Sequence, residues 1–365
     1  MGKKFDCKTL NNLFYKIDMI PEKQIYELRG HIEKAQNPVF FFDNDADGLC
    51  SFLLLRRFCN AGKGVCVKGE LSEDYFRKIN EFHPDYIFIL DKAVVSEKFY
   101  EKIREINIPI VCIDHHSFNE NEIPDFVNYY NPLENGNISA SVSYFCYNVT
   151  RKKEDLWIAV VGCIADKFVP EFYGDFEKLY PELSCEYKDA FDLRYKAKIG
   201  KIVRIFNFAL KDKTTNVISL LKFLLKVRTP YEIFEENADN YRMHKRFNFI
   251  EKKYQTLIKK AIEQERFEDN VLFFKYGGDM SISSDLSDEL CYIFPKKLIA
   301  VVYIKDVFAN ISIRGKNALN IFKEIAKEMK TIGGGGHEMS IGVRMNLKLL
   351  DEFEKKLLEI ANRKI

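Results

Sequence analysis

Short apolar runs alternate with amphipathic segments along the first part of the chain. The runs lie near residues 38–43, 64–68, 86–91, 109–114 and 126–130, and helical patterns lie near 48–60, 71–82 and 96–106. Apolar runs of four to eight residues between helical segments are typical of buried parallel strands. This succession of strands and helices predicts an α/β fold with a doubly wound parallel sheet.

The pattern changes in the second half of the chain. Residues 186–265 have helical periodicity with little strand signal, and strand patterns return at 271–274, 298–304 and 307–313. A helix near 319–329, four glycines, a short strand to Met345 and a closing helix complete the chain. We therefore expect a sheet domain at 1–185, a helical connector at 186–268 and a smaller C-terminal α/β domain at 269–365.

Composition limits the class of protein. The chain has 365 residues, of which 47% are hydrophobic and 30% charged, as in ordinary globular proteins. No apolar stretch approaches a membrane span of about 20 residues, and residues 1–30 lack the apolar core of a signal peptide. The nine cysteines are scattered without a Cys-x-x-Cys pair. We expect reduced thiols in a cytoplasmic protein with no membrane contact.

Charge is unevenly distributed. The net charge is +2, yet residues 188–260 contain 18 Lys and Arg against 8 Asp and Glu. Aromatic residues such as Phe247, Phe249 and Tyr254 interleave with the basic ones in the connector. Basic groups can follow a nucleic-acid backbone while aromatics stack on bases. The alternative is an amphipathic helix that buries its aromatics and leaves its lysines in water.

Three of the predicted strands lead directly into acidic residues. Asp43, Asp45 and Asp47 follow the first, Asp91 follows the third, and Asp114 with His115 and His116 follows the fourth. These side chains should meet beyond the carboxyl ends of the strands, where open parallel sheets bind ligands. Crowded carboxylates need a counter-charge, and this oxygen-rich set with some imidazole suits manganese or magnesium, with two ions expected. For any single aspartate the alternative is a helix cap.

These residues resemble the motifs of a known family. Residues 43–48, Asp91, residues 114–116 and Asp166 look like the four motifs of the DHH phosphoesterases. Residues 312–315 and 333–337 look like the DHH-associated C-terminal domain. The Asp-x-Asp-x-Asp-Gly form, with Phe41 where oligoribonuclease-type members carry a metal-binding histidine, is similar to the RecJ branch and its archaeal relatives.

The resemblance implies roles for individual residues. It implies metal ligation by Asp45, Asp47, Asp91, His115 and Asp166, with Asp43, Asp114 and His116 as ligands or as supports of ligands. Within this set we expect Asp45, Asp114, His115 and His116 to be catalytic. Lys92, directly after Asp91, departs from the small or neutral residue expected there. Ser139 and Ser141 match a serine stretch of the family, with a helix N-cap as the alternative.

The C-terminal glycines and one arginine are the expected substrate contacts. A run of glycines lets backbone N–H groups approach an anion. Arg314 could clamp a phosphate with its planar fork. The expected substrate-binding residues are Arg314, Gly334, Gly335, Gly336 and His337, and the alternative for the glycine run is a flexible turn.

We therefore expect a manganese- or magnesium-dependent exonuclease that degrades single-stranded DNA or RNA to mononucleotides. Two alternatives stay open at this point. One is hydrolysis of short oligoribonucleotides, phosphoadenosine phosphate or cyclic dinucleotides, and the other is an inactive scaffold in a replication or repair complex. A protein partner from replication, repair or RNA processing is expected for grip on long strands, and the oligomeric state is open.

Overall fold

The computed structural model describes residues 20–117, 123–135, 140–265 and 269–364. These form two compact units, one running through Phe247 and the other beginning at Asn248. No helix within the described ranges is both long enough and apolar enough to cross a membrane. The division differs from the three parts predicted from sequence, because the predicted connector is not a separate unit.

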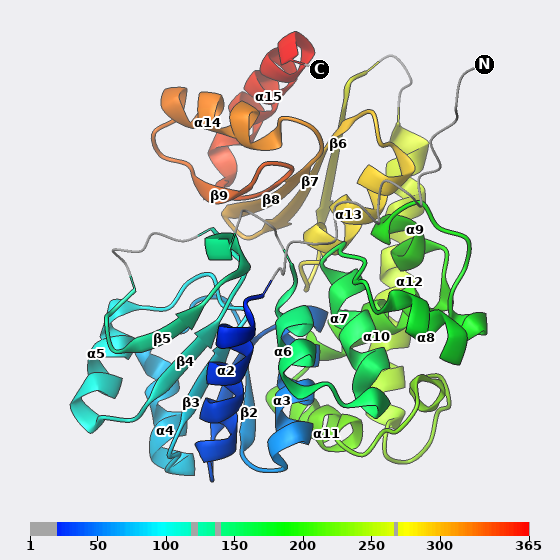
Figure 1. Ribbon diagram of the computed structural model, residues 1–365. Helices are drawn as coiled ribbons and strands as arrows, with labels where there is room; N and C mark the ends of the chain where they lie inside the picture. Colours follow the sequence, from blue (N-terminus) through cyan, green and yellow to red (C-terminus); the bar gives the residue numbers. More distant parts are fainter. Residues whose placement is uncertain (1–19, 118–122, 136–139, 266–268, 365) are drawn as a thin grey trace, which may run out of the picture. The chain divides into compact units, whose positions relative to one another are not determined.

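The centre of the first unit is a five-stranded parallel sheet (Figure 1). Its strands are β1 (Val39–Asp43), β2 (Lys63–Val67), β3 (Ile87–Leu90), β4 (Ile110–Ile113) and β5 (Val127–Tyr130). They lie in the order β2-β1-β3-β4-β5 with every pairing parallel. The strand order reverses at β1, which is the topological switch point of a doubly wound sheet. The predicted fold class is confirmed, and the strands follow the predicted apolar runs closely.

Helices cover both faces of this sheet because successive side chains of a strand point to opposite faces. On one face, α4 (Phe76–Phe82) and α5 (Glu97–Ile106) pack against a core that contains Phe41. On the other face lie α2 (Glu22–Lys34), α3 (Ala46–Cys59) and α6 (Val142–Thr150). There Phe52 of α3 stacks on Phe42 with 5.0 Å between ring centroids.

The remaining helices of the first unit pack beside α3 and α6. They are α7 (Leu156–Ala165), α8 (Tyr173–Leu179), α9 (Ala190–Tyr195), α10 (Lys198–Leu210) and α11 (Thr214–Leu224). Helix α7 packs along α3 and α6, and α10 packs along α7. The apolar side of α10, including Ile202 and Phe206, is buried in these contacts. That burial explains why helices predicted as a connector belong to the first unit. Helix α12 (Tyr241–Gln264) crosses the division.

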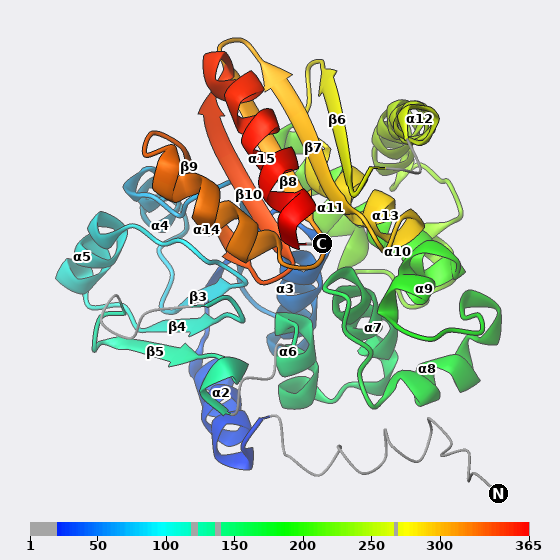
Figure 2. The ribbon, with the colours of Figure 1, turned by 90° about the horizontal axis from the view of Figure 1, so that it is seen from above.

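The second unit contains a five-stranded mixed sheet (Figure 2). Its strands are β6 (Val271–Gly277), β7 (Leu298–Lys305), β8 (Phe308–Arg314), β9 (Gly333–His337) and β10 (Ser340–Asn346), in the order β6-β7-β8-β10-β9. Helices α14 (Ala318–Glu328) and α15 (Leu350–Lys364) bury their apolar faces on one side of this sheet. Helix α13 (Ser283–Ile293), which the sequence pattern did not predict, packs on β7 and β8.

The run of glycines forms the edge strand β9, where the sequence predicted a loop. A Cβ on Gly334 would lie 2.6 Å from the carbonyl oxygen of Gly342. A Cβ on Gly336, whose φ is 151°, would lie 2.1 Å from the carbonyl oxygen of Ser340. Close approach of the β10 backbone therefore requires glycine at these two positions.

Candidate metal centre

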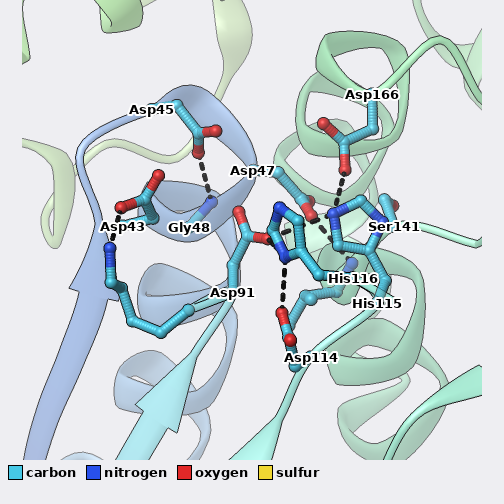
Figure 3. A network of polar contacts seen from close by, with 12 residues as sticks. Asp43, Asp45, Asp47, Gly48, Asp91, Asp114, His115, His116, Ser141 and Asp166 are labelled. Carbon is cyan, nitrogen blue, oxygen red and sulfur yellow. Dashed lines mark hydrogen bonds and ion pairs between the residues drawn. The ribbon is translucent and has the colours of Figure 1, made fainter. Parts of the chain in front are cut away.

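Three strands of the first unit end in an acidic residue at the same edge of the sheet. Asp43 is the last residue of β1, Asp91 directly follows β3, and Asp114 directly follows β4. Figure 3 shows their side chains together with those of residues from α3 and from the end of α7. The edge is the one at which open α/β sheets bind their ligands.

Helix α3 begins directly after β1 and contributes two more carboxylates. Asp45 caps the helix, because its carboxylate accepts a hydrogen bond from the N–H of Gly48 at 2.9 Å. A Cβ on Gly48 would lie 2.7 Å from the backbone nitrogen of Asp43, so the tight turn from strand to helix requires glycine. Asp47 lies in the first turn of the helix and is fully buried.

The N-terminus of α6 holds the carboxylate of Asp47 in place. Asp47 accepts hydrogen bonds from the backbone N–H groups of Val142 at 2.7 Å and Ser143 at 3.0 Å. The positive end of the helix dipole favours a negative charge at this position. Ser141 is the N-cap of α6 and accepts from the N–H of Tyr144, which is the alternative role considered for it from sequence. Ser139 lies outside the described residues.

His115 lies between the buried carboxylate of Asp91 and the half-buried carboxylate of Asp166. Its Nε2 is 3.2 Å from Asp91 Oδ1 and 3.3 Å from Asp166 Oδ2 (Figure 3). Among the described residues neither of these oxygens has a hydrogen-bond donor, although both are buried. Ligand atoms from Asp47, Asp91, His115 and Asp166 all lie within 4.8 Å of one another. We call these four residues the ligand cluster.

Asp114 serves a different purpose from the other strand-end acids. Its Oδ1 lies 2.8 Å from Nδ1 of His116, and its Oδ2 accepts from the hydroxyl of Tyr129 at 3.5 Å. Asn131 donates to the carbonyl oxygen of His116 at 2.9 Å. A carboxylate at Nδ1 keeps a proton on that nitrogen and fixes the orientation of the ring. Asp114 thus orients the ring of His116.

Burial and mutual repulsion of the acids perturb their ionisation. Burial, followed by the nearby charge of Asp166, raises the pKa of Asp47 well above its usual value. Burial and the neighbouring Asp45 do the same to the pKa of Asp91. Burial, with Asp43 as the next contributor, raises the pKa of Asp45 to about 6. The metal-free site therefore tends to take up protons as its counter-charge.

The two histidines and Asp114 shift in the direction expected for opposite charges. Burial lowers the pKa of His115, but the surrounding carboxylates, Asp166 foremost, outweigh it and raise the pKa. Burial also opposes the charge on His116, yet its bond to Asp114 raises the pKa of His116 overall. The pKa of Asp114 is lowered, because the bond to His116 outweighs burial.

The ligand cluster fits a hard divalent cation. It offers three carboxylates and one imidazole, and two of its buried oxygens lack donors among the described residues. Oxygen-rich sets of this kind suit Mn²⁺ or Mg²⁺ better than structural zinc sites, which are built from thiolate and imidazole. Asp43, expected as a ligand or as a support of ligands, is ion-paired with Lys92 at 2.6 Å.

Two family models match the chain, in the order in which the two units occur. Residues 39–165 match the DHH family, N-terminal domain, and residues 268–363 match the DHHA1 domain. The chain belongs to the DHH family. The ligand cluster lies within the first match, except for Asp166, which directly follows it.

Several solved structures resemble this DHH-family chain in fold. RecJ from Thermus thermophilus in complex with Mn²⁺ has 14% identity and a TM-score of 0.68, and the match covers 96% of this chain and 56% of that one. An exonuclease RecJ bound to manganese has 16% identity and a TM-score of 0.62, covering 95% and 96% of the two chains. CDC45 from Entamoeba histolytica has 12% identity and a TM-score of 0.51, covering 93% and 98%. No curated protein matches the chain in sequence.

The DHHA1 domain of this DHH-family chain contains the predicted substrate contacts. Arg314 donates from Nε to Asp288 at 2.7 Å and from Nη2 to Ser284 at 2.8 Å. The fork predicted to clamp a phosphate is therefore engaged within its own domain. The side chain of His337 lies outside the described residues.

An open patch lies on the face of this sheet opposite to α14 and α15. Gly335 and Gly342 are cross-strand partners, and no described atom lies within 4 Å of a Cβ added to either. On the same strand as Gly342, Arg344 is exposed, and its guanidinium lies 4.7 Å from the ring centroid of the exposed Phe308. Glycine in a strand without a packing reason can mark the close approach of a ligand.

The aromatic residues of α12 divide between two roles. Phe247 and Tyr254 are buried, as the amphipathic-helix alternative requires. Phe249 is 47% exposed, and the ammonium of Lys253 lies 4.4 Å from its ring centroid.

Two features of the centre were not found from sequence, namely the amides of α6 that bind Asp47 and the partner of Lys92. The only signal for the second was a lysine directly after a strand-end aspartate.

Proposed function

We propose that this chain is a manganese- or magnesium-dependent exonuclease that degrades single-stranded nucleic acid to mononucleotides. The observation that carries the proposal is the ligand cluster. In it, buried oxygens of Asp91 and Asp166 lie beside His115 and lack hydrogen-bond donors among the described residues. Leaving such carboxylates without a counter-charge is costly. A divalent cation satisfies them and is the cofactor that phosphodiester hydrolysis requires here.

Each residue of the centre has a distinct role in the proposal. Asp47, Asp91, His115 and Asp166 hold the cation, and α6 fixes the orientation of Asp47. When bound, the cation lowers the pKa of a water molecule and neutralises charge on the phosphoryl group. Asp45 caps the N-terminus of α3 by accepting a hydrogen bond from Gly48, and so stabilises the start of this helix next to the end of β1.

His116 is the proton donor for the departing oxygen in this proposal. Asp114 keeps a proton on Nδ1 of His116 and raises the pKa of His116, so that the imidazolium form of His116 persists toward neutral pH. A general acid acts best when its pKa lies near the working pH. The other nitrogen of the ring is then the one that faces the substrate.

The second unit supports a polymer as the substrate. Its open glycine patch lies beside Arg344 and Phe308, an arrangement that can carry a base and an adjacent phosphate. Phe249 and Lys253 on α12 offer a second exposed aromatic with a cation. The solved relatives include an exonuclease RecJ bound to manganese, which favours the same substrate class. The chain spans 56% of the Thermus RecJ chain. A partner protein that helps to hold long strands stays part of the proposal.

The experiment is a time course on single-stranded DNA and RNA labelled at either end, with Mn²⁺, with Mg²⁺ and with chelator. We expect release of labelled mononucleotides that depends on the metal, and little release from blunt duplexes. The matched control is His115→Ala, with circular dichroism to verify its fold. Cleavage only of dinucleotides or cyclic dinucleotides would favour the short-substrate alternative. Full activity in His115→Ala or with chelator would refute the assignment.

A further inference from the structure

Asp43 at the end of β1 already has a cation beside it. The ammonium of Lys92 lies 2.6 Å from Asp43 Oδ1 and also donates to the carbonyl oxygen of Gly69. The Lys92 side chain is 6% exposed, although lysine is among the residues least often buried. A buried ammonium is stable only when it is paired and hydrogen-bonded, and both conditions are met here.

The backbone of Asp91 explains how two successive residues serve opposite sides of the centre. Asp91 has a φ of 60°, a left-handed conformation that is uncommon for a residue other than glycine. Its own side chain reaches the ligand cluster, while the next residue, Lys92, reaches Asp43. Figure 3 shows Asp43 and Asp45 on one side of Asp91, and His115 and Asp166 on the other. Strained residues of this kind are maintained where function needs them.

The charges of the two sides differ accordingly. On the side of His115 and Asp166, two buried oxygens lack hydrogen-bond donors among the described residues, and a metal ion would satisfy them. On the side of Asp43, the carboxylate is neutralised by an ammonium that belongs to the chain. A divalent ion bridging Asp43 would have to displace Lys92 or remain close to its positive charge. Repulsion between such a divalent ion and the nearby ammonium of Lys92 weakens binding of the ion by about 100-fold or more.

We propose that Lys92 takes the place of one of the two metal ions expected for this centre. The chain then binds a single divalent ion, at Asp47, Asp91, His115 and Asp166, and Lys92 supplies a fixed positive charge on the Asp43 side. Lys92 is a positioning residue, since it acts through Asp43, the carboxylate that it neutralises. The inference rests on the proposed function, because it assumes that the ligand cluster binds a metal.

The test is the number of Mn²⁺ ions bound per chain. The full-length protein is dialysed to equilibrium against Mn²⁺, and bound metal is measured by mass spectrometry, with electron paramagnetic resonance to detect a spin-coupled pair. We expect one ion and no pair in the wild type. Lys92→Met, which keeps the length of the side chain without its charge, should bind two ions as a coupled pair. Lys92→Arg should bind one.

A double variant separates a new ligand from a general loosening of the site. Lys92→Met combined with Asp43→Asn should return to one ion, because the freed carboxylate is then absent. Two ions in the wild type, or one ion in folded Lys92→Met, would overturn the role of Lys92 and leave the proposed function intact. No bound ion in any of these proteins would overturn the metal centre itself, and the inference with it.

Discussion

The metal-free protein should become less stable as pH rises from about 4 to 7, and the bound metal should remove this dependence. The reason is the raised pKa of Asp45, about 6 in the folded chain against 3.8 for an ordinary aspartate. A carboxyl group whose pKa is raised by folding binds its proton more tightly in the folded state. It therefore destabilises the fold progressively as pH rises through the interval between the two pKa values.

The size of the effect follows from the interval between the two values. At about 1.4 kcal/mol per pH unit, the step from 3.8 to about 6 corresponds to about 3 kcal/mol for Asp45 at pH above 7. Asp45 is only partly buried, so water screening makes this an upper limit. Within the metal centre, the raised pKa values of Asp47, Asp91, His115 and His116 act in the same direction, and the lowered pKa of Asp114 opposes them.

The assay is urea unfolding of chelator-treated protein at pH 4.5, 6 and 7.5, repeated with Mn²⁺ at the two higher values. Asp45→Asn is the informative variant, because its amide oxygen can still cap Gly48 but cannot ionise. We expect this variant to be more stable than the metal-free wild type at pH 7.5 by up to about 3 kcal/mol. Metal-free wild-type stability that is flat or rises between pH 4.5 and 7.5 would refute the reasoning.

Three further changes test other parts of the site. Gly162→Ala places a Cβ 2.0 Å from Ser143 Oγ, so we expect a loss of about 1–3 kcal/mol in urea unfolding with weaker Mn²⁺ binding by calorimetry. Asp114→Asn leaves the ligand cluster intact but removes the negative charge that raises the pKa of His116. We expect kcat to fall about 10–100-fold, with an unchanged amount of bound metal and a lower His116 pKa measured by NMR. Gly342→Thr fills the open face of β10 without a clash, so its unfolding free energy should change by less than about 1 kcal/mol while fluorescence anisotropy detects weaker binding of single-stranded DNA. An unchanged rate, or unchanged DNA binding, would contradict the second and third expectations respectively.

The sheet of the first unit could be predicted from sequence because its signal is local. Each strand is a short apolar run, and Asp43, Asp91 and Asp114 mark strand ends that topology then brings to one edge. The positions of these residues in the centre follow from the order of the strands alone. The fold class and the family were accordingly confirmed.

The features that sequence did not predict depend on contacts between distant segments. Residues 333–337 carry no strand-forming side chains, so their pairing with β10 appears only in the tertiary structure. The engagement of Arg314 by Asp288 depends on α13, a helix that the apolar pattern did not reveal. The location of Lys92 depends on the left-handed backbone of Asp91, which no sequence rule assigns to an aspartate in advance.

Two carboxylates of the metal centre also hold the fold together at the same edge of the sheet. Asp45 caps α3, and Asp47 ties the start of α3 to the start of α6 across 95 residues of sequence. Removing either carboxylate by alanine would therefore break a cap or a helix contact as well as removing a charge from the centre. Asparagine keeps the one acceptor oxygen that Asp45 uses in its cap, but at Asp47 it keeps only one of the two acceptors and turns an NH₂ group toward the other backbone N–H. We therefore expect Asp47→Asn to lose stability as well as Mn²⁺ binding, whereas Asp45→Asn keeps its cap.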